Sequence, residues 1–257
     1  MTNFWELVNK VIEEADIILE VLDARMIDET RNKEIEDKVL QAGKILVFVI
    51  NKCDLADKNE LERQKKLLRN SVFISATQRL GLSYLREKIG RFTPKKLPPN
   101  KKIKIGVLGY PNTGKSTVIN ALKGHTAAKT SSASGFTKGI QLVRLNQRMY
   151  LIDSPGVIPY KEHDEFKHVL IGAKTQEHVK DPELAAMELI GKLGGVVEDY
   201  YGITRGHDEE TALEDIARKM HKLRKGNEPD THAAARLILR AWQSGKIKPP
   251  RQSFKLW

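Results

Sequence analysis

The chain has 257 residues and a single cysteine, Cys53, so it is long enough for one full domain and a smaller one, while an intramolecular disulfide is excluded. The charged N-terminus is not typical of a secretion signal, and no apolar run approaches the roughly 20 residues that cross a bilayer, so we expect a cytoplasmic protein without membrane contact. A net charge of +11 favours a polyanionic partner such as nucleic acid.

The first ninety residues alternate between apolar runs of strand length and helical stretches. The strands are expected within 16–23, 44–54 and 71–75. The helices are expected over 29–43, 58–69 and 81–90. Because the strands are β-branched and almost continuously apolar, they are typical of parallel strands covered on both faces. The alternation therefore predicts an α/β fold with a doubly wound, mostly parallel sheet.

A Pro- and Lys-rich stretch, 93–102, can be neither a helix nor a central strand, and it indicates a stiff connector. The α/β pattern resumes after it. A strand is expected at 104–109, a helix over 115–122, and a hairpin from the apolar runs 139–145 and 148–153. The connector therefore joins two parts of one sheet rather than two separate domains.

Strand signals stop after Tyr160, which predicts an α/β domain over 1–160 and a small helical domain over 161–257. Its helices are expected over 182–193, 209–225 and 231–244, and each is followed by a glycine that can close it. The last helix carries an apolar face that we assign to the core, made of Ala234, Leu237, Ile238, Ala241 and Trp242.

The C-terminal forty residues carry much of the positive charge, with eleven Lys or Arg residues and two acidic ones from Arg218 onward. These side chains can bind phosphates or can form a solvated basic face. The basic residues we consider for nucleic acid are Arg236, Arg240, Lys246, Lys248, Arg251 and Lys255. Phe254 and Trp257 are weaker candidates for stacking on bases.

Residues 109–116, GYPNTGKS, match the phosphate-binding pattern GxxxxGK[ST], directly after an apolar strand and at the start of a helix. The loop is expected to wrap phosphates, with Lys115 reaching the β- and γ-phosphates and the Ser116 hydroxyl binding Mg²⁺. The predicted nucleotide contacts of this stretch are Pro111, Asn112, Thr113, Gly114, Lys115, Ser116 and Thr117.

Two further segments fit the γ-phosphate end of such a site. DSPG, 153–156, follows an apolar strand, which predicts that Asp153 holds Mg²⁺ through water and that the Gly156 amide meets the γ-phosphate. Thr137 is the candidate switch threonine that completes the Mg²⁺ shell, although a solvated loop threonine is the alternative reading. Lys115, Thr137 and Gly156 are the predicted catalytic residues.

NKCD, 51–54, ends the second strand and predicts a guanine-reading site. The Asp54 carboxylate can accept from both guanine N1–H and the N2 amino group, whereas adenine offers an acceptor at N1. Asn51 is expected to brace the site and bond the base, and the Lys52 stem to lie along the base plane. One βα unit later comes SAT, made of Ser75, Ala76 and Thr77, where the Ala76 amide is the candidate donor to guanine O6.

These motifs form a complete guanine-nucleotide site in an unusual order, because the base motifs precede the phosphate loop. A domain whose ends lie side by side can be joined there and opened elsewhere without changing its packing. The connector 93–102 provides such a join, so we predict a circularly permuted domain.

The ordered motifs VLDAR (21–25), TRN (30–32), NKCD, SAT, GYPNTGKST, GFTKG and DSPGV resemble those of the circularly permuted GTPases of the YlqF/YawG family. The resemblance implies a P-loop GTPase fold with GTP, GDP and Mg²⁺ as ligands. It also implies GTP hydrolysis coupled to assembly of the large ribosomal subunit, and a helical C-terminal domain that contacts ribosomal RNA.

The resemblance also bears on the rate of hydrolysis. Val157 stands where Ras-like enzymes place a water-orienting glutamine, so we expect slow intrinsic turnover. Asn112 matches an asparagine that helps to hold K⁺ in related GTPases, which makes it a candidate K⁺ ligand. The N-terminus lacks the PGHM-like segment of bacterial members, so the water-orienting residue stays unassigned, with His163 and His168 as weak candidates.

Two other functions fit the same motifs. One is a GTPase that acts on another RNA, such as tRNA, and the other is a GTP-dependent RNA-binding scaffold that hydrolyses GTP slowly. We expect a monomer whose partner is the large ribosomal subunit or its rRNA.

Overall fold

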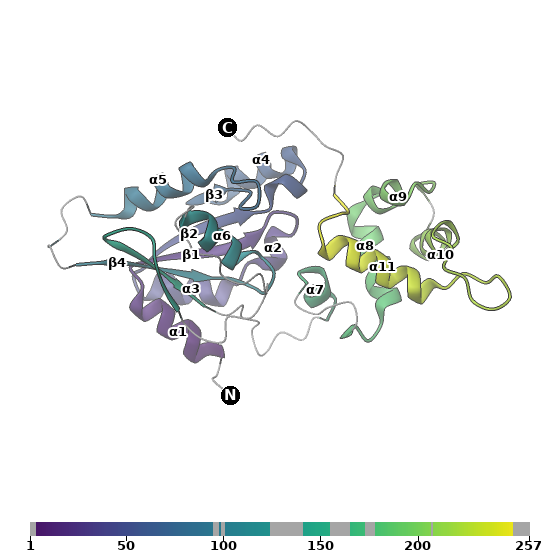
Figure 1. Ribbon diagram of the computed structural model, residues 1–257, viewed down its shortest axis with the longest axis horizontal. Helices are drawn as coiled ribbons and strands as arrows, with labels where there is room; N and C mark the ends of the chain where they lie inside the picture. The colour runs from purple at the N-terminus through teal and green to yellow at the C-terminus, as the bar shows by residue number, and fades with distance from the viewer. Residues whose placement is uncertain are drawn as a thin grey trace. The chain divides into compact units, whose positions relative to one another are not determined.

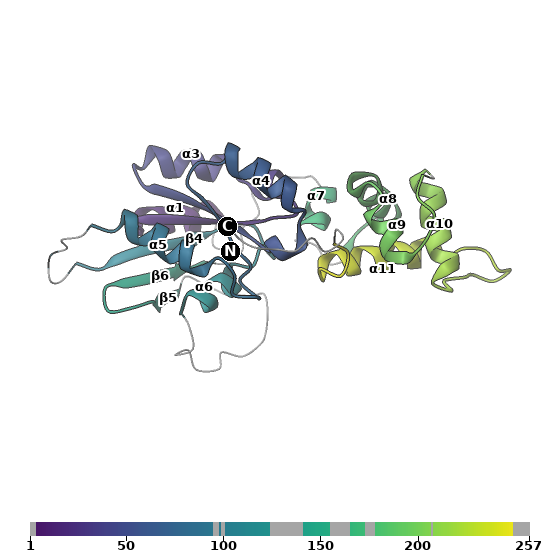
Figure 2. The same cartoon turned by 90° about the horizontal axis from the view of Figure 1, so that it is seen from above.

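Six strands form one sheet in the order β3-β2-β1-β4-β6-β5 (Figures 1 and 2). Their bounds are Ile17–Asp23 for β1, Ile45–Asn51 for β2, Ser71–Phe73 for β3, Ile103–Leu108 for β4, Gln141–Arg144 for β5 and Met149–Asp153 for β6. All neighbours pair in parallel except β5 and β6, which are antiparallel. The strand order reverses between β1 and β4, and ligands of such sheets bind at the carboxyl ends next to that reversal.

The computed structural model describes residues 4–94, 98, 101–123, 141–154, 165–172, 178–206 and 208–248. The described residues form two compact units, which lie within 1–162 and 163–251. Among the described residues, no helix is long and apolar enough to cross a membrane.

Helices cover both faces of the sheet (Figure 2). The helices of this unit are α1 (Phe4–Glu14), α2 (Ile27–Thr30), α3 (Lys33–Gln41), η1 (Cys53–Leu55), α4 (Lys58–Leu67), α5 (Leu82–Phe92) and α6 (Lys115–Lys123). Side chains of α1, α3 and α4 share one core cluster with Ile18 and Leu22 of β1. Side chains of α5 and α6 share the other cluster with Ile17, Leu19 and Val21. Successive residues of β1 thus point into opposite cores, which confirms the predicted doubly wound sheet.

In this unit, one helix expected from the sequence is wrong and another helix was missed. The helix expected over 29–43 is two helices, because Asn32 adopts an extended backbone and its side chain caps α3 by accepting from the Ile35 amide. Helix α1 was not expected at all from the sequence, although it contributes Val8 and Val11 to the core. The connector 93–102 lies only partly within the described residues.

The second unit is helical, with α7 (Glu165–Leu170), α8 (Pro182–Leu193), α9 (Val196–Tyr201), α10 (Glu209–Lys219) and α11 (Thr231–Gln243). Helix α11 packs against α8 and α10. The Trp242 indole is buried and donates a 2.9 Å hydrogen bond to the Leu170 carbonyl of α7. Ala234, Ile238 and Ala241 are also buried, whereas Leu237 is half-buried.

The helix expected over 209–225 ends at Lys219 instead. Residues 222–230 double back, with the Arg224 amide donating to the Glu228 carbonyl at 2.8 Å and a β-bridge between Leu223 and Pro229. Gly226 and Asn227 both have positive φ, of 94° and 66°. Such backbone angles belong to a tight turn and not to a helix interior, so Gly226 is a turn residue and does not close the helix.

Candidate functional site

The phosphate-loop motif has the geometry that its sequence predicted, with strand β4 ending at Leu108 and helix α6 starting at Lys115. Gly114 has a φ of +95°, and a Cβ there would lie 2.3 Å from Asn51 Nδ2. Asn112 also has positive φ, at 59°. A side chain at position 114 would therefore strain the backbone and clash with Asn51, so this position of the loop requires glycine.

Lys115 is buried within this loop, and its ammonium donates to the carbonyl oxygens of Gly109 at 2.9 Å and Tyr110 at 2.7 Å. Burial lowers the pKa of Lys115 to about 8, and the negative charge of Asp153 opposes that shift. An ammonium held at a phosphate loop by carbonyl oxygens can turn toward an anionic ligand, which would restore its pKa.

Asn51 joins three predicted motifs. It is the last residue of β2, and its side-chain amide Nδ2 donates a 3.0 Å hydrogen bond to the Thr113 carbonyl of the phosphate loop. Its Oδ1 accepts from the Ala76 amide at 3.1 Å. These two bonds link Asn51 to the phosphate loop and to the SAT turn, while its contact with the base stays a prediction. The Ala76 amide is used by Asn51 here, so its contact with guanine O6 stays a prediction.

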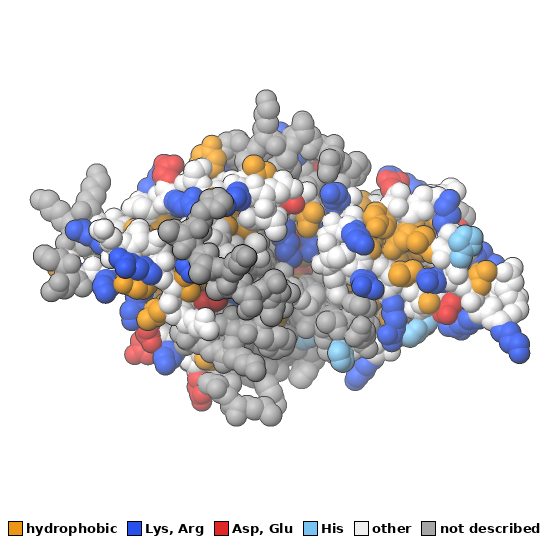
Figure 3. All heavy atoms as spheres, in the orientation of Figure 1, with side chains coloured by type: hydrophobic (Ala, Val, Ile, Leu, Met, Phe, Trp, Pro, Cys, Tyr) orange, Lys and Arg blue, Asp and Glu red, His pale blue; other side chains and the backbone are white. Residues whose placement is uncertain are grey.

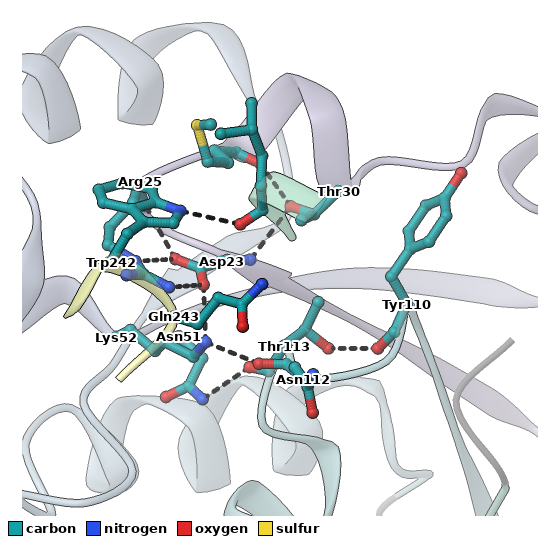
Figure 4. Close-up of polar contacts among 12 residues, drawn as sticks. Asp23, Arg25, Thr30, Asn51, Lys52, Tyr110, Asn112, Thr113, Trp242 and Gln243 are labelled. Carbon is teal, nitrogen blue, oxygen red and sulfur yellow. Dashed lines mark hydrogen bonds and ion pairs between the residues drawn. The ribbon is translucent and has the colours of Figure 1, made fainter. Parts of the chain in front are cut away.

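Lys52 follows in a left-handed backbone conformation, with a φ of 64°. Its ammonium donates to the Asn112 carbonyl at 2.6 Å and to Asp23 Oδ2 at 2.7 Å (Figure 4). Both donors of the NKCD motif therefore contact consecutive carbonyls of the phosphate loop, and the two motifs that are sixty residues apart in the chain form one site.

Only one of the two Asp54 carboxylate oxygens has a hydrogen-bond partner among the described residues. Gln78 Nε2 donates to its Oδ2 at 3.1 Å, while its Oδ1 is buried and has no hydrogen-bond partner among the described residues. A buried acceptor without a partner is costly unless a ligand supplies the donor. Guanine N1–H and the N2 amino group are donors of the right kind, so this carboxylate fits the predicted base.

The remaining SAT residues shape the turn after β3. Ser75 is buried, and its Oγ lies 3.3 Å from Thr77 Oγ1 and accepts from the Gln78 amide at the same distance. These contacts fix the turn that carries the Ala76 amide and Gln78 toward Asn51 and Asp54. Sequence reasoning missed Gln78, although its place directly after SAT was a usable signal.

Two of the predicted magnesium ligands, Ser116 and Asp153, lie on α6 and β6, which contact each other. Ser116 and Thr117 are exposed in the first turn of α6. Asp153 ends β6, pairs in register with Val107 of β4 and is buried, and the following Ser154 donates to the Val107 carbonyl at 2.7 Å. Hydroxyl and carboxylate oxygens are ligands that Mg²⁺ prefers, so these residues fit the ion. In the described part of the chain, no group of three or more His, Cys, Asp or Glu side chains could hold a metal by itself.

Several predicted residues lie outside the described part of the chain: Thr137, Gly156, Val157, His163, Arg251, Phe254, Lys255 and Trp257. His168 is described, and it is buried in α7 of the helical unit. Pro111 is half-buried in the phosphate loop.

The helical unit carries the basic residues considered for nucleic acid. Arg240 and Lys246 are exposed, and Arg236 and Lys248 are half-buried. On the face shown in Figure 3, Lys and Arg side chains surround an apolar area over α8 and α11. The surface is thus mixed, with positive charge around an apolar centre.

Comparisons with known proteins show which proteins this chain resembles. A sequence model of the family described as 50S ribosome-binding GTPase matches residues 104–225. An uncharacterized GTP-binding protein of Methanocaldococcus jannaschii is 40% identical over 94% of this chain and 65% of its own length. Nucleolar GTP-binding protein 2 of Saccharomyces cerevisiae is 33% identical over 95% of this chain and 52% of its own length. The chain thus spans between about half and two thirds of these relatives.

Solved structures show the same fold. GNP-bound YlqF from T. maritima matches with a TM-score of 0.65 at 24% identity, over 95% of this chain and 94% of that one. A GDP-bound YlqF structure matches with a TM-score of 0.67, over 94% and 95%. These matches confirm the predicted circularly permuted P-loop GTPase fold. The family match begins in β4 and leaves out NKCD, as expected where the base motif precedes the phosphate loop.

Proposed function

We propose that this chain is a circularly permuted GTPase that binds and hydrolyses GTP as a molecular switch in assembly of the large ribosomal subunit. Its YlqF-like fold and its sequence similarity to GTP-binding proteins support this. One observation supports nucleotide binding above the others. Asn51 and Lys52 of the base motif both donate to carbonyls of the phosphate loop, at 3.0 and 2.6 Å. A base reader and a phosphate loop in direct contact can hold the two ends of one nucleotide.

In this proposal, each end of the nucleotide meets residues suited to it. Asp54 accepts from the guanine, Lys115 turns from its carbonyl acceptors to the β- and γ-phosphates, and the amides of the loop donate to the phosphate oxygens. Mg²⁺ would be held by Ser116, by Asp153 through water and by Thr137, and it would neutralise developing charge on the phosphates. The Gly156 amide completes the set at the γ-phosphate.

We expect slow intrinsic hydrolysis, because Val157 cannot orient water. K⁺ held by Asn112 would supply positive charge at the phosphates. Turnover measured in K⁺ and in Na⁺, with and without ribosomal subunits, tests both statements. Equal rates in the two salts would remove the K⁺ role.

The proposed partner is large-subunit rRNA, bound by the basic helical domain over 161–257, while 1–160 is the nucleotide-binding domain. Arg240 and Lys246 are exposed on the helical unit and suit phosphate contacts. The names of the relatives, which include a nucleolar GTP-binding protein and a 50S ribosome-binding GTPase family, support a ribosomal role. We expect the protein to act as a monomer in the cytoplasm.

Co-sedimentation with purified large subunits, small subunits and tRNA tests the proposal, with a non-hydrolysable GTP analogue compared with GDP. Salt must be fixed near physiological strength, because a basic domain binds any RNA at low ionic strength. Binding to large subunits only with the GTP analogue is expected. Preference for tRNA would favour a GTPase for another RNA. GTP-dependent binding without multiple turnover would favour a scaffold, and equal binding in both nucleotide states would contradict the switch.

A further inference from the structure

Asp23, at the carboxyl end of β1, is a buried carboxylate that faces two cations. Arg25 donates to it three times, from Nε at 3.0 Å, from Nη2 at 2.8 Å and from its backbone amide at 3.1 Å. Lys52 adds a fourth bond, from its ammonium to Asp23 Oδ2 at 2.7 Å. The Asp23 and Arg25 side chains are only 4% and 5% exposed, so water screens this pair very little.

The backbone around Asp23 is also fixed. Its amide donates to Thr30 Oγ1 at 3.1 Å, and that hydroxyl donates to the Met26 carbonyl of the same corner at 2.6 Å. The Ala24 amide donates to the Asn51 carbonyl at 2.8 Å, which continues the pairing of β1 with β2. Asp23 is therefore held on its backbone and its side chain, independently of Lys52.

The position of the Lys52 ammonium depends on Asp23, whereas the position of the Asp23 carboxylate does not depend on Lys52. A lysine side chain has a flexible four-carbon stem, and that of Lys52 is still 22% exposed, so its ammonium can leave one carbonyl for water. The rigid Asp23–Arg25 pair supplies a fixed anion at 2.7 Å that keeps the Lys52 ammonium at the Asn112 carbonyl. The two cations explain why the pKa of Asp23 falls to about 2 in spite of burial, which raises it.

We propose that Asp23 is a positioning residue of the nucleotide site. It keeps the Lys52 ammonium at the Asn112 carbonyl, and so links the base motif to the left-handed Asn112 turn of the phosphate loop (Figure 4). The proposal rests on the proposed function, because it assigns a new residue to the same guanine-nucleotide site. Its role is distinct from that of Asp54, which faces the edge of the base.

A thermodynamic cycle with GDP as the probe tests this role. Dissociation constants for GDP and inosine diphosphate are measured for wild type, Asp23→Asn, Lys52→Met and the double variant. Because Asp23 acts through Lys52, each single variant should weaken GDP binding by about 10-fold or more, and Asp23→Asn should add less than about twofold in the Lys52→Met background. The ratio of the two dissociation constants should stay as in wild type, since inosine lacks only the amino group that Asp54 reads.

Glu36→Gln is the matched control. Glu36 also forms a part-buried carboxylate–guanidinium pair, with Arg31 at 2.6 Å, but that pair does not contact Lys52. The Glu36→Gln variant should bind GDP with the same affinity as wild type. If Asp23→Asn does not fold, Asp23→Glu keeps the charge and moves the carboxylate by one methylene, and it should still weaken GDP binding several-fold.

The outcomes separate this inference from the proposed function. A wild-type chain that fails to bind GDP would contradict the proposed function itself. A wild type that binds GDP, while folded Asp23 variants bind it equally well, overturns only the role of Asp23. If the loss of GDP affinity in the double variant equals the product of the two single-variant losses, Asp23 acts by a route other than Lys52. This result also overturns the proposal.

Discussion

Asn51 and Thr113 are 62 positions apart in the chain, and the Asn51 amide donates a 3.0 Å hydrogen bond to the Thr113 carbonyl. The contact exists because β2 and β4 both flank β1 in the sheet, so their carboxyl ends lie at the same edge. Their order in the chain does not enter this geometry. A permuted connection therefore leaves the base motif and the phosphate loop in the contact that a guanine nucleotide requires.

Replacement of Asn51 tests how much this contact contributes. Asn51→Ala leaves two buried groups without their present partners, the Thr113 carbonyl and the Ala76 amide. We expect a loss of about 1–3 kcal/mol in the free energy of unfolding and at least about 10-fold weaker GDP binding. Urea unfolding and fluorescence titration with labelled GDP measure the two effects. Asn120→Ala, at an exposed position of α6, should change neither.

Gly114 tests the shape of the phosphate loop. An added Cβ would lie 2.3 Å from Asn51 Nδ2, at a φ of +95° that side chains rarely adopt. Gly114→Ala must therefore displace Asn51 or the loop, and we expect GDP binding to fall by about 10-fold or more. Gly43→Ala is the control, because Gly43 also has positive φ, at +66°, but has nothing within 4 Å of its added Cβ. It should lower stability slightly and leave GDP affinity unchanged.

Local patterns in the sequence were sufficient to predict most of the sheet and the two binding motifs. Apolar β-branched runs identify β1 and β2, and the spacing of GYPNTGKS fixes the loop between β4 and α6. Which side chains meet across the sheet could not be predicted in this way. The Lys52 bond to the Asn112 carbonyl depends on the register of three strands and on a left-handed turn, so only the folded structure reveals it.

Asp23 and Arg25 show a different limit. Both were visible in the motif VLDAR, but a charged residue at a strand end is most simply a solvated one, and the sequence does not reveal that Asp23 is 3% exposed. The over-long helix at 209–225 has a local cause, because Gly226 was assigned as a helix end when it belongs to the turn at 222–230. In both cases, the structure depends on contacts that the periodicity of the sequence does not reveal.

The pH dependence of nucleotide binding should report on Lys115. Burial lowers its pKa to about 8 in the free protein, and phosphate oxygens would raise it in the complex. At pH 7 the ammonium is almost fully charged, so GDP affinity should be flat up to about pH 7 and about twofold weaker at pH 8. Above pH 8 binding must take up a proton, and affinity should fall, approaching about 10-fold per pH unit. Lys115→Gln should bind GDP weakly and without this slope, and a flat wild-type profile to pH 9 would contradict the prediction.

Base specificity should follow Asp54. Asp54→Asn replaces one acceptor oxygen with a donor amide, which opposes the guanine amino group but suits the carbonyl that xanthine carries at that position. We expect GDP to bind about 100-fold more weakly and xanthosine diphosphate more tightly than in wild type. Competition titrations with the two nucleotides measure the change. Gln78→Ala removes the hydrogen bond to Asp54 Oδ2 but leaves the charge, so it should weaken GDP binding less and keep the preference for guanine.

Glu20 links the stability of the α/β unit to pH. It is fully buried in β1, and its Oε1 accepts from the Asn32 amide at 2.9 Å. Burial raises its pKa from 4.5 to about 8, so the unfolded chain releases this proton at lower pH than the folded one. The contribution of Glu20 to stability is therefore fully present below pH 4.5 and is lost as pH rises to about 8.

Glu20→Gln removes that titration while it keeps an acceptor for the Asn32 amide. The variant should gain stability relative to wild type as pH rises, by an amount on the order of 1–4 kcal/mol between pH 5 and pH 8. Urea unfolding of both proteins at pH 5, 6.5 and 8 gives the difference directly. A difference that stays constant over this range would mean that Glu20 is ionised in the folded protein, and that its buried carboxylate is stabilised by its neighbours at α3.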